Sequence, residues 1–283
     1  MAGKRMANRQ MMRFLTYAVI VFGSIFIILP IICMLARAFT PHFYMETIPP
    51  LILPDLHKVG LANLQFAWVQ GKFSVYFWNN AFVAVTVCVG QTLLGAMIAY
   101  PLALANFPGK KALFAVVLTT MLIPGTTLFI PQYLLVRDLH WINTWQAQIV
   151  PMIAWGVPFN AFLLMSFFVS VPREIEESVM IDGGNRWTFF TRILLPISTA
   201  AISTAIIFGF LGAWDEFFWN LTIMSDEGKR LLNVAIYSFQ SQFDTDLGVL
   251  NAALSLVVIP SLIVFIVFQK RFVKGVTAGA VKG

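Results

Sequence analysis

Six long apolar runs constrain this chain more than any other feature of its sequence. The runs lie at residues 14–35, 73–108, 112–136, 141–172, 193–214 and 247–269, and none of them contains Lys, Arg, Asp or Glu. Each is long enough to cross a bilayer. A hydrocarbon core of about 30 Å is crossed by about 20 residues in a helix, and backbone amides inside it must be paired. We therefore expect an all-α membrane protein of six spans, at residues 14–36, 77–105, 112–136, 145–171, 197–221 and 248–270.

The positive charges of the chain predict its orientation and argue against a nucleic-acid partner. Charged residues make up only 11% of the chain, against about 25% in soluble domains. With the N-terminus in the cytoplasm, the six spans place 13 of the 19 Lys and Arg residues on the cytoplasmic side. This bias agrees with the positive-inside rule. We expect a multi-pass protein in contact with membrane lipid, with cytoplasmic N- and C-termini.

Residue types that carry chemistry are sparse in this sequence. Cys33 and Cys88 lie inside expected spans, and the three histidines are scattered over loops without metal-ligand spacing. No phosphate-binding glycine loop is present. We expect no catalytic residues, no metal site and no directly bound cofactor. No linker or composition break divides the chain, so we also expect a single domain over residues 1–283, with Pro124-Gly125 as the sharpest helix break.

A charged stretch at residues 172–196 interrupts the apolar pattern between the fourth and fifth spans. Pro172 can open a helix, and the glutamates that follow suit the positive end of its dipole. Gly183 and Gly184 can end that helix in left-handed geometry, and Asn185 is a favourable N-cap for a second helix.

The second helix of this stretch is expected to place Trp187, Phe190 and Leu194 on one face, with Phe189 and Ile193 beside it. The pattern thus predicts a helix–turn–helix with an acidic surface and an apolar surface. An amphipathic hairpin resting on lipid headgroups is the alternative. Anionic headgroups would repel the acidic surface, so contact with a protein is favoured.

These residues resemble the signature cytoplasmic loop of ABC importer permeases, written Glu-Ala-Ala, three residues, Gly, nine residues, Ile, one residue, Leu-Pro. Glu177, Gly183, Ile193, Leu195 and Pro196 fall at that spacing, with Ser178 and Val179 in place of the two alanines. The resemblance implies the type I importer fold and a coupling helix that docks on a separate ATPase subunit. The coupling residues it implies are Glu174, Glu177, Ser178, Asp182, Gly183, Gly184, Ile193 and Pro196.

The likeness extends over most of the chain and is closest to carbohydrate-uptake permeases. Residues 80–100 and Phe107-Pro108-Gly109 resemble their second span and the following turn. The tail at residues 271–283 resembles the ending of the maltose-type subunit. In that family the tail reaches into the ATPase dimer, which implies ATPase contacts for Gly279, Lys282 and Gly283.

An acidic pair, Asp215 and Glu216, lies beside Trp214 at the outer end of the expected fifth span. Trp214-Asp215-Glu216-Phe217 resembles the Trp-Asn-Glu-Phe sequence of the sugar permeases, which favours a gate or pathway role for this pair together with Trp214 and Asn220. The alternative is a solvated acidic pair in an aromatic interface belt. The sequence leaves both interpretations open.

The resemblance implies the function and the partners of the chain. We expect a permease subunit in the cytoplasmic (inner) membrane of a bacterium or archaeon. It would pair with a second permease, two ABC ATPase subunits that hold ATP and Mg, and an extracytoplasmic sugar-binding protein. No Lys or Arg lies inside an apolar run, so a neutral sugar is favoured over an anion.

Two other classes of protein are weighed against this interpretation. A secondary transporter driven by an ion gradient needs ionisable groups deep in its helices and usually an internal repeat. A membrane-embedded enzyme needs paired catalytic residues within its spans. Neither pattern is present in the sequence.

Overall fold

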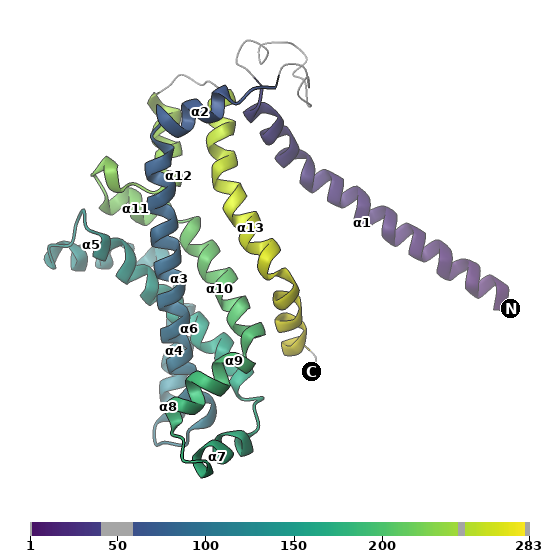
Figure 1. Ribbon diagram of the computed structural model, residues 1–283, viewed down its shortest axis with the longest axis vertical. Coiled ribbons are helices and arrows are strands. Elements are labelled where there is room, and N and C mark those ends of the chain that lie inside the picture. Colours follow the sequence, from purple (N-terminus) through teal and green to yellow (C-terminus); the bar gives the residue numbers. More distant parts are fainter. Residues whose placement is uncertain (1, 41–58, 243–246, 281–283) are drawn as a thin grey trace. The chain divides into compact units, whose positions relative to one another are not determined.

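The computed structural model describes residues 2–40, 59–242 and 247–280, and nearly all of them are helical (Figure 1). Side chains are described for residues 9–40, 59–238 and 247–270. No β-strand occurs in these described ranges. The helices form two compact units, residues 1–73 with 236–257 and residues 74–235 with 258–283. The single domain expected over residues 1–283 stays a prediction.

The first unit contains α1 (Ala2–Ala38), α2 (Ala62–Val69), most of α12 (Leu232–Gln242) and the beginning of α13 (Leu247–Ala280). The amide of Asn63 at the start of α2 donates to the carbonyl of Thr40 at 2.8 Å. Ala67 and Phe73 are fully buried. These contacts hold α2 against the chain that leaves α1.

The second unit is built around three helices, α3 (Phe73–Leu104), α6 (Trp145–Phe168) and α10 (Thr199–Trp214). Small residues bring them close together. A Cβ atom at Gly90 of α3 would lie 2.5 Å from Ile153 Cδ1, and one at Gly95 would lie 2.6 Å from the Cβ of Asn160. Helices in membranes associate through such small residues, because apolar lipid supplies little hydrophobic driving force between them.

The remaining elements of the second unit are short. α4 (Lys110–Leu122), a 3₁₀ turn at Gly125–Leu128 and α5 (Phe129–Asp138) lead from α3 to α6. α7 (Arg173–Ile181), α8 (Arg186–Phe189), a π-helical turn at Phe190–Leu194 and α9 (Leu195–Ile197) lead from α6 to α10. α11 (Phe218–Ile223) and a 3₁₀ turn at Glu227–Lys229 lead from α10 to α12. Figure 1 shows α7 and α8 beyond the carboxyl-terminal end of α3.

Four helical segments are long and apolar enough to cross a membrane: Arg9–Ala38, Phe73–Leu104, Trp145–Phe168 and Leu247–Lys270. Two further candidate spans are each a pair of helices that meet at a sharp bend. Lys110–Leu122 and Gly125–Asp138 meet at 91°, and Arg186–Ile197 and Thr199–Trp214 meet at 79°. The described residues thus hold four candidate spans that are single helices, or up to six if each bent pair is one span.

The third expected span, over residues 112–136, is two helices rather than one. The break predicted at Pro124-Gly125 is confirmed, because α4 ends at Leu122 and Ile123 is extended at φ −80° and ψ 118°. Proline disfavours the helical conformation in the residue before it and cannot donate a backbone hydrogen bond. The chain therefore turns sharply at this point.

The fifth expected span, over residues 197–221, also differs from the structure. α10 ends at Trp214, and a separate short helix follows after Phe217. The carbonyl of Trp214 accepts hydrogen bonds from the side-chain amides of Asn80 at 3.1 Å and Asn233 at 3.2 Å. These two amides satisfy a carbonyl that a continuing helix would otherwise use, so the helix can end here.

Candidate functional site

The first helix of the charged stretch is α7, which begins at Arg173 directly after Pro172. Glu174 and Glu176 lie in its first turn, where the helix dipole favours negative charge. The helix ends as the glycines predict. Gly183 has φ +80°, the N–H of Gly184 donates to the Val179 carbonyl at 2.9 Å, and the N–H of Gly183 donates to the Met180 carbonyl at 3.2 Å. This is the Schellman arrangement.

The second helix begins at the predicted N-cap. The side-chain oxygen of Asn185 accepts the backbone N–H of Thr188 at 2.8 Å. The apolar face differs from the expected one, since Phe189, Phe190 and Leu194 are buried whereas Trp187 is 61% exposed. The π-helical turn at Phe190–Leu194 has wider turns than an α-helix. It therefore changes the register of the residues before it, and Phe189 rather than Trp187 enters the core.

The hairpin formed by these two helices, residues 172–196, is anchored in the three-helix core. Phe189, Phe190 and Leu194 belong to a buried cluster with small and aromatic residues of α3, α6 and α10, and Val179 of α7 packs against it. Close-packed protein interiors have low compressibility and transmit strain. A displacement of the hairpin would therefore act directly on the core helices.

The coupling residues expected from the resemblance lie mostly on the surface of this hairpin. Ile193 and Gly184 are half-buried. The exposed ones are Glu174, Glu177, Ser178, Asp182, Gly183 and Pro196. Apolar side chains accompany the acids on α7, since Ile181 is 85% exposed and Ile175 and Met180 are also exposed. The outward surface is therefore mixed acidic and apolar rather than purely acidic.

Glu176 is the functional candidate on α7 that sequence reasoning missed. It is half-buried and faces the core, where its Oε1 accepts a 2.6 Å hydrogen bond from the hydroxyl of Tyr100 on α3. The Tyr100 ring in turn packs on Phe189 and Phe190 at centroid distances of 6.0 and 5.5 Å. A lone tyrosine near the end of an apolar run was the only sequence signal for this contact.

The candidate gate residues lie around the end of α10. Trp214 and Asn220 are fully buried, whereas Asp215 is exposed. The carboxylate of Glu216, beyond the end of α10, accepts the backbone N–H groups of Trp219 at 2.7 Å and Asn220 at 2.9 Å. Burial raises the pKa of the Glu216 carboxyl, and these hydrogen bonds oppose the rise.

Asn220 connects three segments near this point. Its Nδ2 donates to Gln148 Oε1 on α6 at 3.0 Å, and its Oδ1 accepts the backbone N–H of Leu231 at 3.0 Å. The indole N–H of the neighbouring Trp219 donates to the Ala147 carbonyl at 2.8 Å. Asn220 and Trp219 thus fix α11 against α6, and a gate or pathway role for Trp214, Asp215, Glu216 and Asn220 stays a prediction.

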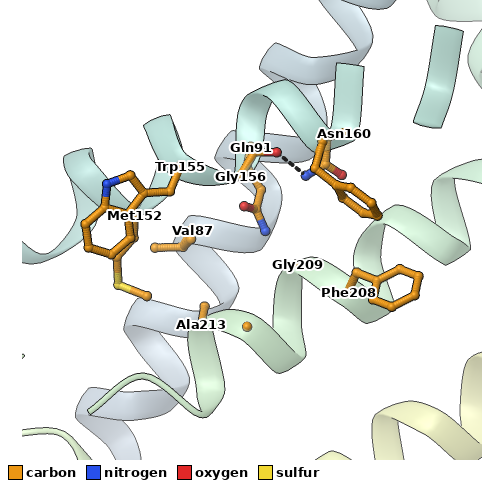
Figure 2. Close-up of a pocket in the computed structure, with 11 residues that line it drawn as sticks. Val87, Gln91, Met152, Trp155, Gly156, Asn160, Phe208, Gly209 and Ala213 are labelled. Atoms are coloured by element: carbon orange, nitrogen blue, oxygen red, sulfur yellow. Dashed lines mark hydrogen bonds between the residues drawn. The ribbon is translucent and has the colours of Figure 1, made fainter. Parts of the chain in front are cut away.

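A cavity of about 210 Å³ lies between α3, α6 and α10, and sequence reasoning did not identify it (Figure 2). Its lining includes the side-chain amides of Gln91 and Asn160 and three large aromatic side chains, Trp155, Phe159 and Phe208. The indole N–H of Trp155 has no hydrogen-bond partner among the described residues. Gln91 and Asn160 are single amides inside long apolar runs, and this feature of the sequence could have indicated the cavity. A polar group at membrane depth is costly, so its presence points to a function.

Three of the expected site residues belong to the tail. Gly279 lies in the last turn of α13, where side chains are not described. Lys282 and Gly283 lie outside the described residues. Over the described ranges no group of three or more His, Cys, Asp or Glu residues could hold a metal ion, and the absence of a metal site from the whole chain stays a prediction.

Known proteins with similar sequences are transport permeases. The diacetylchitobiose uptake system permease protein of Streptomyces coelicolor is 31% identical over 267 residues, which cover 94% of this chain and 87% of that protein. The trehalose/maltose transport system permease protein of Thermococcus litoralis is 32% identical over 212 residues, covering 75% and 76%. Both alignments extend over most of each protein.

Solved structures show the same fold. A chain of a bacterial ABC transporter involved in the import of the acidic polysaccharide alginate superposes with a TM-score of 0.82, over 93% of this chain and 97% of that chain, at 19% identity. The expected all-α type I importer permease fold is therefore confirmed. The family model of binding-protein-dependent transport system inner membrane components matches residues 91–278, which include the whole hairpin and every residue that lines the cavity except Val87. This chain belongs to that family of membrane-integral transport permeases.

Proposed function

We propose that this chain is a transmembrane permease subunit of an ABC importer that moves a sugar or oligosaccharide into the cytoplasm by alternating access. The observation that carries the proposal is the hairpin at residues 172–196, which keeps the family spacing and rests on the core helices. Relatives across 75–94% of the chain are named as uptake systems for diacetylchitobiose and for trehalose and maltose. Nothing in the structure or the relatives favours a transporter driven by an ion gradient.

The hairpin would transmit motion from an ATPase subunit to the core. Its exposed surface combines Glu174 and Glu177 with the apolar side chain of Ile181, which suits a protein groove better than water or anionic lipid. Its buried surface joins the cluster that contains residues of α3, α6 and α10. When the ATPase subunits close on ATP, they would pull on the exposed surface of the hairpin. The buried cluster would then tilt the core helices.

The partners in this proposal are a second permease, two ABC ATPase subunits and an extracytoplasmic sugar-binding protein. ATP and Mg would be held by the ATPase subunits, since the sequence has no phosphate-binding glycine loop. A related solved transporter was crystallised with an alginate pentasaccharide-bound periplasmic protein, at a TM-score of 0.61 to this chain. This supports a binding protein as the source of substrate.

The proposal places the chain in the cytoplasmic membrane of a bacterium or archaeon with both termini in the cytoplasm. The distribution of Lys and Arg supports this orientation. It puts the hairpin at the cytoplasmic face, where an ATPase subunit is accessible. Labelling of a single cysteine placed at Glu177 from the outside of intact cells would contradict it.

Co-purification tests the coupling part of the proposal. The full transporter is expressed with a tag on the ATPase subunit, and recovery of this chain is compared for wild type, Glu177→Lys and Gly183→Trp. Both changes alter the exposed hairpin surface, so recovery should fall. Glu227→Lys is the matched control, because it reverses an exposed glutamate in the loop before α12. Recovery unaffected by the hairpin changes, or sugar uptake that follows a proton gradient without ATP, would overturn the proposal.

A further inference from the structure

A small pocket of about 160 Å³ lies where the carboxyl-terminal end of α3 meets α8. Its lining residues are Met97, Tyr100, Arg186, Trp187 and Phe190. We propose that this pocket holds the headgroup of one phosphatidylethanolamine molecule, with the lipid phosphate on Arg186 and the acyl chains along an exposed apolar face of α3. Such a site depends only on the membership of the chain in a membrane-integral permease family, and not on the proposed sugar or the ATPase subunits.

The pocket lies at the depth of a membrane surface. α3 is a candidate span over Phe73–Leu104, so Tyr100 lies about one turn before the end of that span. The helical stretch Arg186–Ile197 meets α10 at 79°, and a stretch at that angle to a membrane-crossing helix runs along the membrane surface. Tyr and Trp side chains collect at this depth. The pocket therefore opens among the phospholipid headgroups.

Arg186 presents an unneutralised positive charge to this pocket. Its side chain is exposed and forms no hydrogen bond or ion pair with any residue that the structure describes. Lys110, at the same end of α3, instead donates to the backbone carbonyls of Ala103 at 3.3 Å and Ala105 at 3.0 Å. A planar guanidinium can donate two parallel hydrogen bonds to a phosphate. Arg186 therefore has both the charge and the free donors that a lipid phosphate needs.

A carboxylate beside the pocket favours a zwitterionic headgroup over an anionic one. Glu176 Oε1 accepts the 2.6 Å hydrogen bond from the hydroxyl of Tyr100, which lines the pocket. A headgroup with only negative charge would be repelled by this carboxylate. Phosphatidylethanolamine carries a phosphate and a primary ammonium. Arg186 can bind the phosphate while Glu176 attracts the ammonium, so both charges of the headgroup meet an opposite charge.

An exposed apolar face of α3 leads from the pocket along the helix. Val85, Val89, Leu93 and Met97 follow one another at every fourth residue, and each is about half exposed. Residues at this spacing lie on one face of a helix. The helix rises about 18 Å from Val85 to Met97, which is comparable with half of a hydrocarbon core of about 30 Å. The acyl chains of a lipid whose headgroup fills the pocket would therefore lie on this face.

Trp187 completes the site at the junction between headgroup and acyl chains. It is 61% exposed, and its ring packs on the buried ring of Phe190 at a centroid distance of 5.5 Å. The core thus holds the indole in place although most of it is uncovered. An indole combines an apolar ring with a polar N–H and suits the boundary between water and acyl chains. Trp187 therefore suits contact with the glycerol and the first acyl carbons of the lipid.

Native mass spectrometry of the purified transporter tests the site. The full chain, in the complex that it forms, is delipidated in detergent and titrated with phosphatidylethanolamine or with phosphatidylglycerol. We expect wild type to bind one phosphatidylethanolamine more tightly than any further lipid. Arg186→Gln should weaken this binding about tenfold, as for the loss of a hydrogen bond to a charged group. Arg186→Lys keeps the charge but not the planar fork, and should lose less.

Arg192→Gln is the matched control. Arg192 is an exposed arginine of the same hairpin that does not line the pocket, so its loss should leave lipid binding equal to that of wild type. The lipid-free melting temperatures of both arginine variants should agree with that of wild type. Glu176→Gln keeps an acceptor for the Tyr100 hydroxyl but removes the negative charge. The preference for phosphatidylethanolamine over phosphatidylglycerol should therefore shrink in this variant.

A phosphatidylethanolamine with a photoactivatable diazirine in one acyl chain locates the chains. Crosslinks should fall on residues 85–97 of wild type and be lost in Arg186→Gln. No crosslinks on this face would overturn the inference and indicate that another subunit covers it. Equal lipid binding by wild type and Arg186→Gln, or displacement of the lipid by inorganic phosphate, would also overturn it. These readouts need no transport, so a failure of the proposed function would leave them unchanged.

Discussion

The hydroxyl of Tyr100 on α3 donates a 2.6 Å hydrogen bond to Glu176 Oε1 on α7. This bond joins the hairpin at residues 172–196 to the longest helix of the core of the second unit. The two residues are 76 positions apart in the sequence. The Tyr100 ring also packs on Phe189 and Phe190, so one side chain contacts both helices of the hairpin. The first prediction concerns this contact.

Tyr100→Phe should uncouple ATP hydrolysis from transport. The ring contacts remain, and only the bond to Glu176 is lost, at a cost of about 1 kcal/mol in stability. We expect sugar uptake per ATP hydrolysed to fall several-fold in proteoliposomes while ATPase activity persists. Tyr133→Phe in α5 is the control and should leave the ratio unchanged. An unaltered ratio in Tyr100→Phe would show that the bond does not transmit motion.

Gly183→Ala should weaken the hairpin locally. Gly183 has φ +80°, a conformation that costs an L-residue roughly 1–2 kcal/mol. The Schellman turn between α7 and α8 would then loosen, and the ATPase subunit should be retained less well on a tagged permease. Gly23→Ala in α1 is a suitable control, because the residue is helical and the added Cβ would meet no atom from elsewhere in the described residues within 4 Å. Equal retention in both variants would contradict the prediction.

Asn220→Leu should destabilise the protein substantially. The change leaves the buried N–H of Leu231 and the Oε1 of Gln148 without their present partners. Two buried polar groups left unpaired cost about 2–6 kcal/mol in total. The melting temperature of the detergent-solubilised transporter should drop by several degrees. A melting temperature within a degree of wild type would mean that water replaces both bonds.

Asp215→Asn separates the two interpretations of the acidic pair. Asp215 is exposed, so the change should leave the melting temperature unaltered. If Asp215 belongs to a gate or to the contact with the binding protein, uptake should still fall several-fold, and stimulation of the ATPase by the loaded binding protein should fall with it. Uptake equal to that of wild type would identify Asp215 as a solvated interface acid.

The sequence by itself determined the features that depend on neighbouring residues. Pro124 stops α4 because the pyrrolidine ring restricts the residue before it, Gly183 ends α7 because it accepts positive φ, and Asn185 caps α8 with its own side chain. Each effect acts within about one turn of helix. The membrane class and the hairpin were predictable for the same reason, since apolar length and local charge need no tertiary context.

Only the tertiary structure decided the contacts between distant helices. The carbonyl of Trp214 at the end of α10 accepts hydrogen bonds from the amides of Asn80 and Asn233, and the sequence does not show that these residues meet. The cavity depends on Gly156 and Gly209 facing Gln91, and periodicity cannot predict which helices face each other. The periodicity of apolar side chains predicts which face of a helix is buried. The packing of the three helices decides which residues of the other helices contact that face.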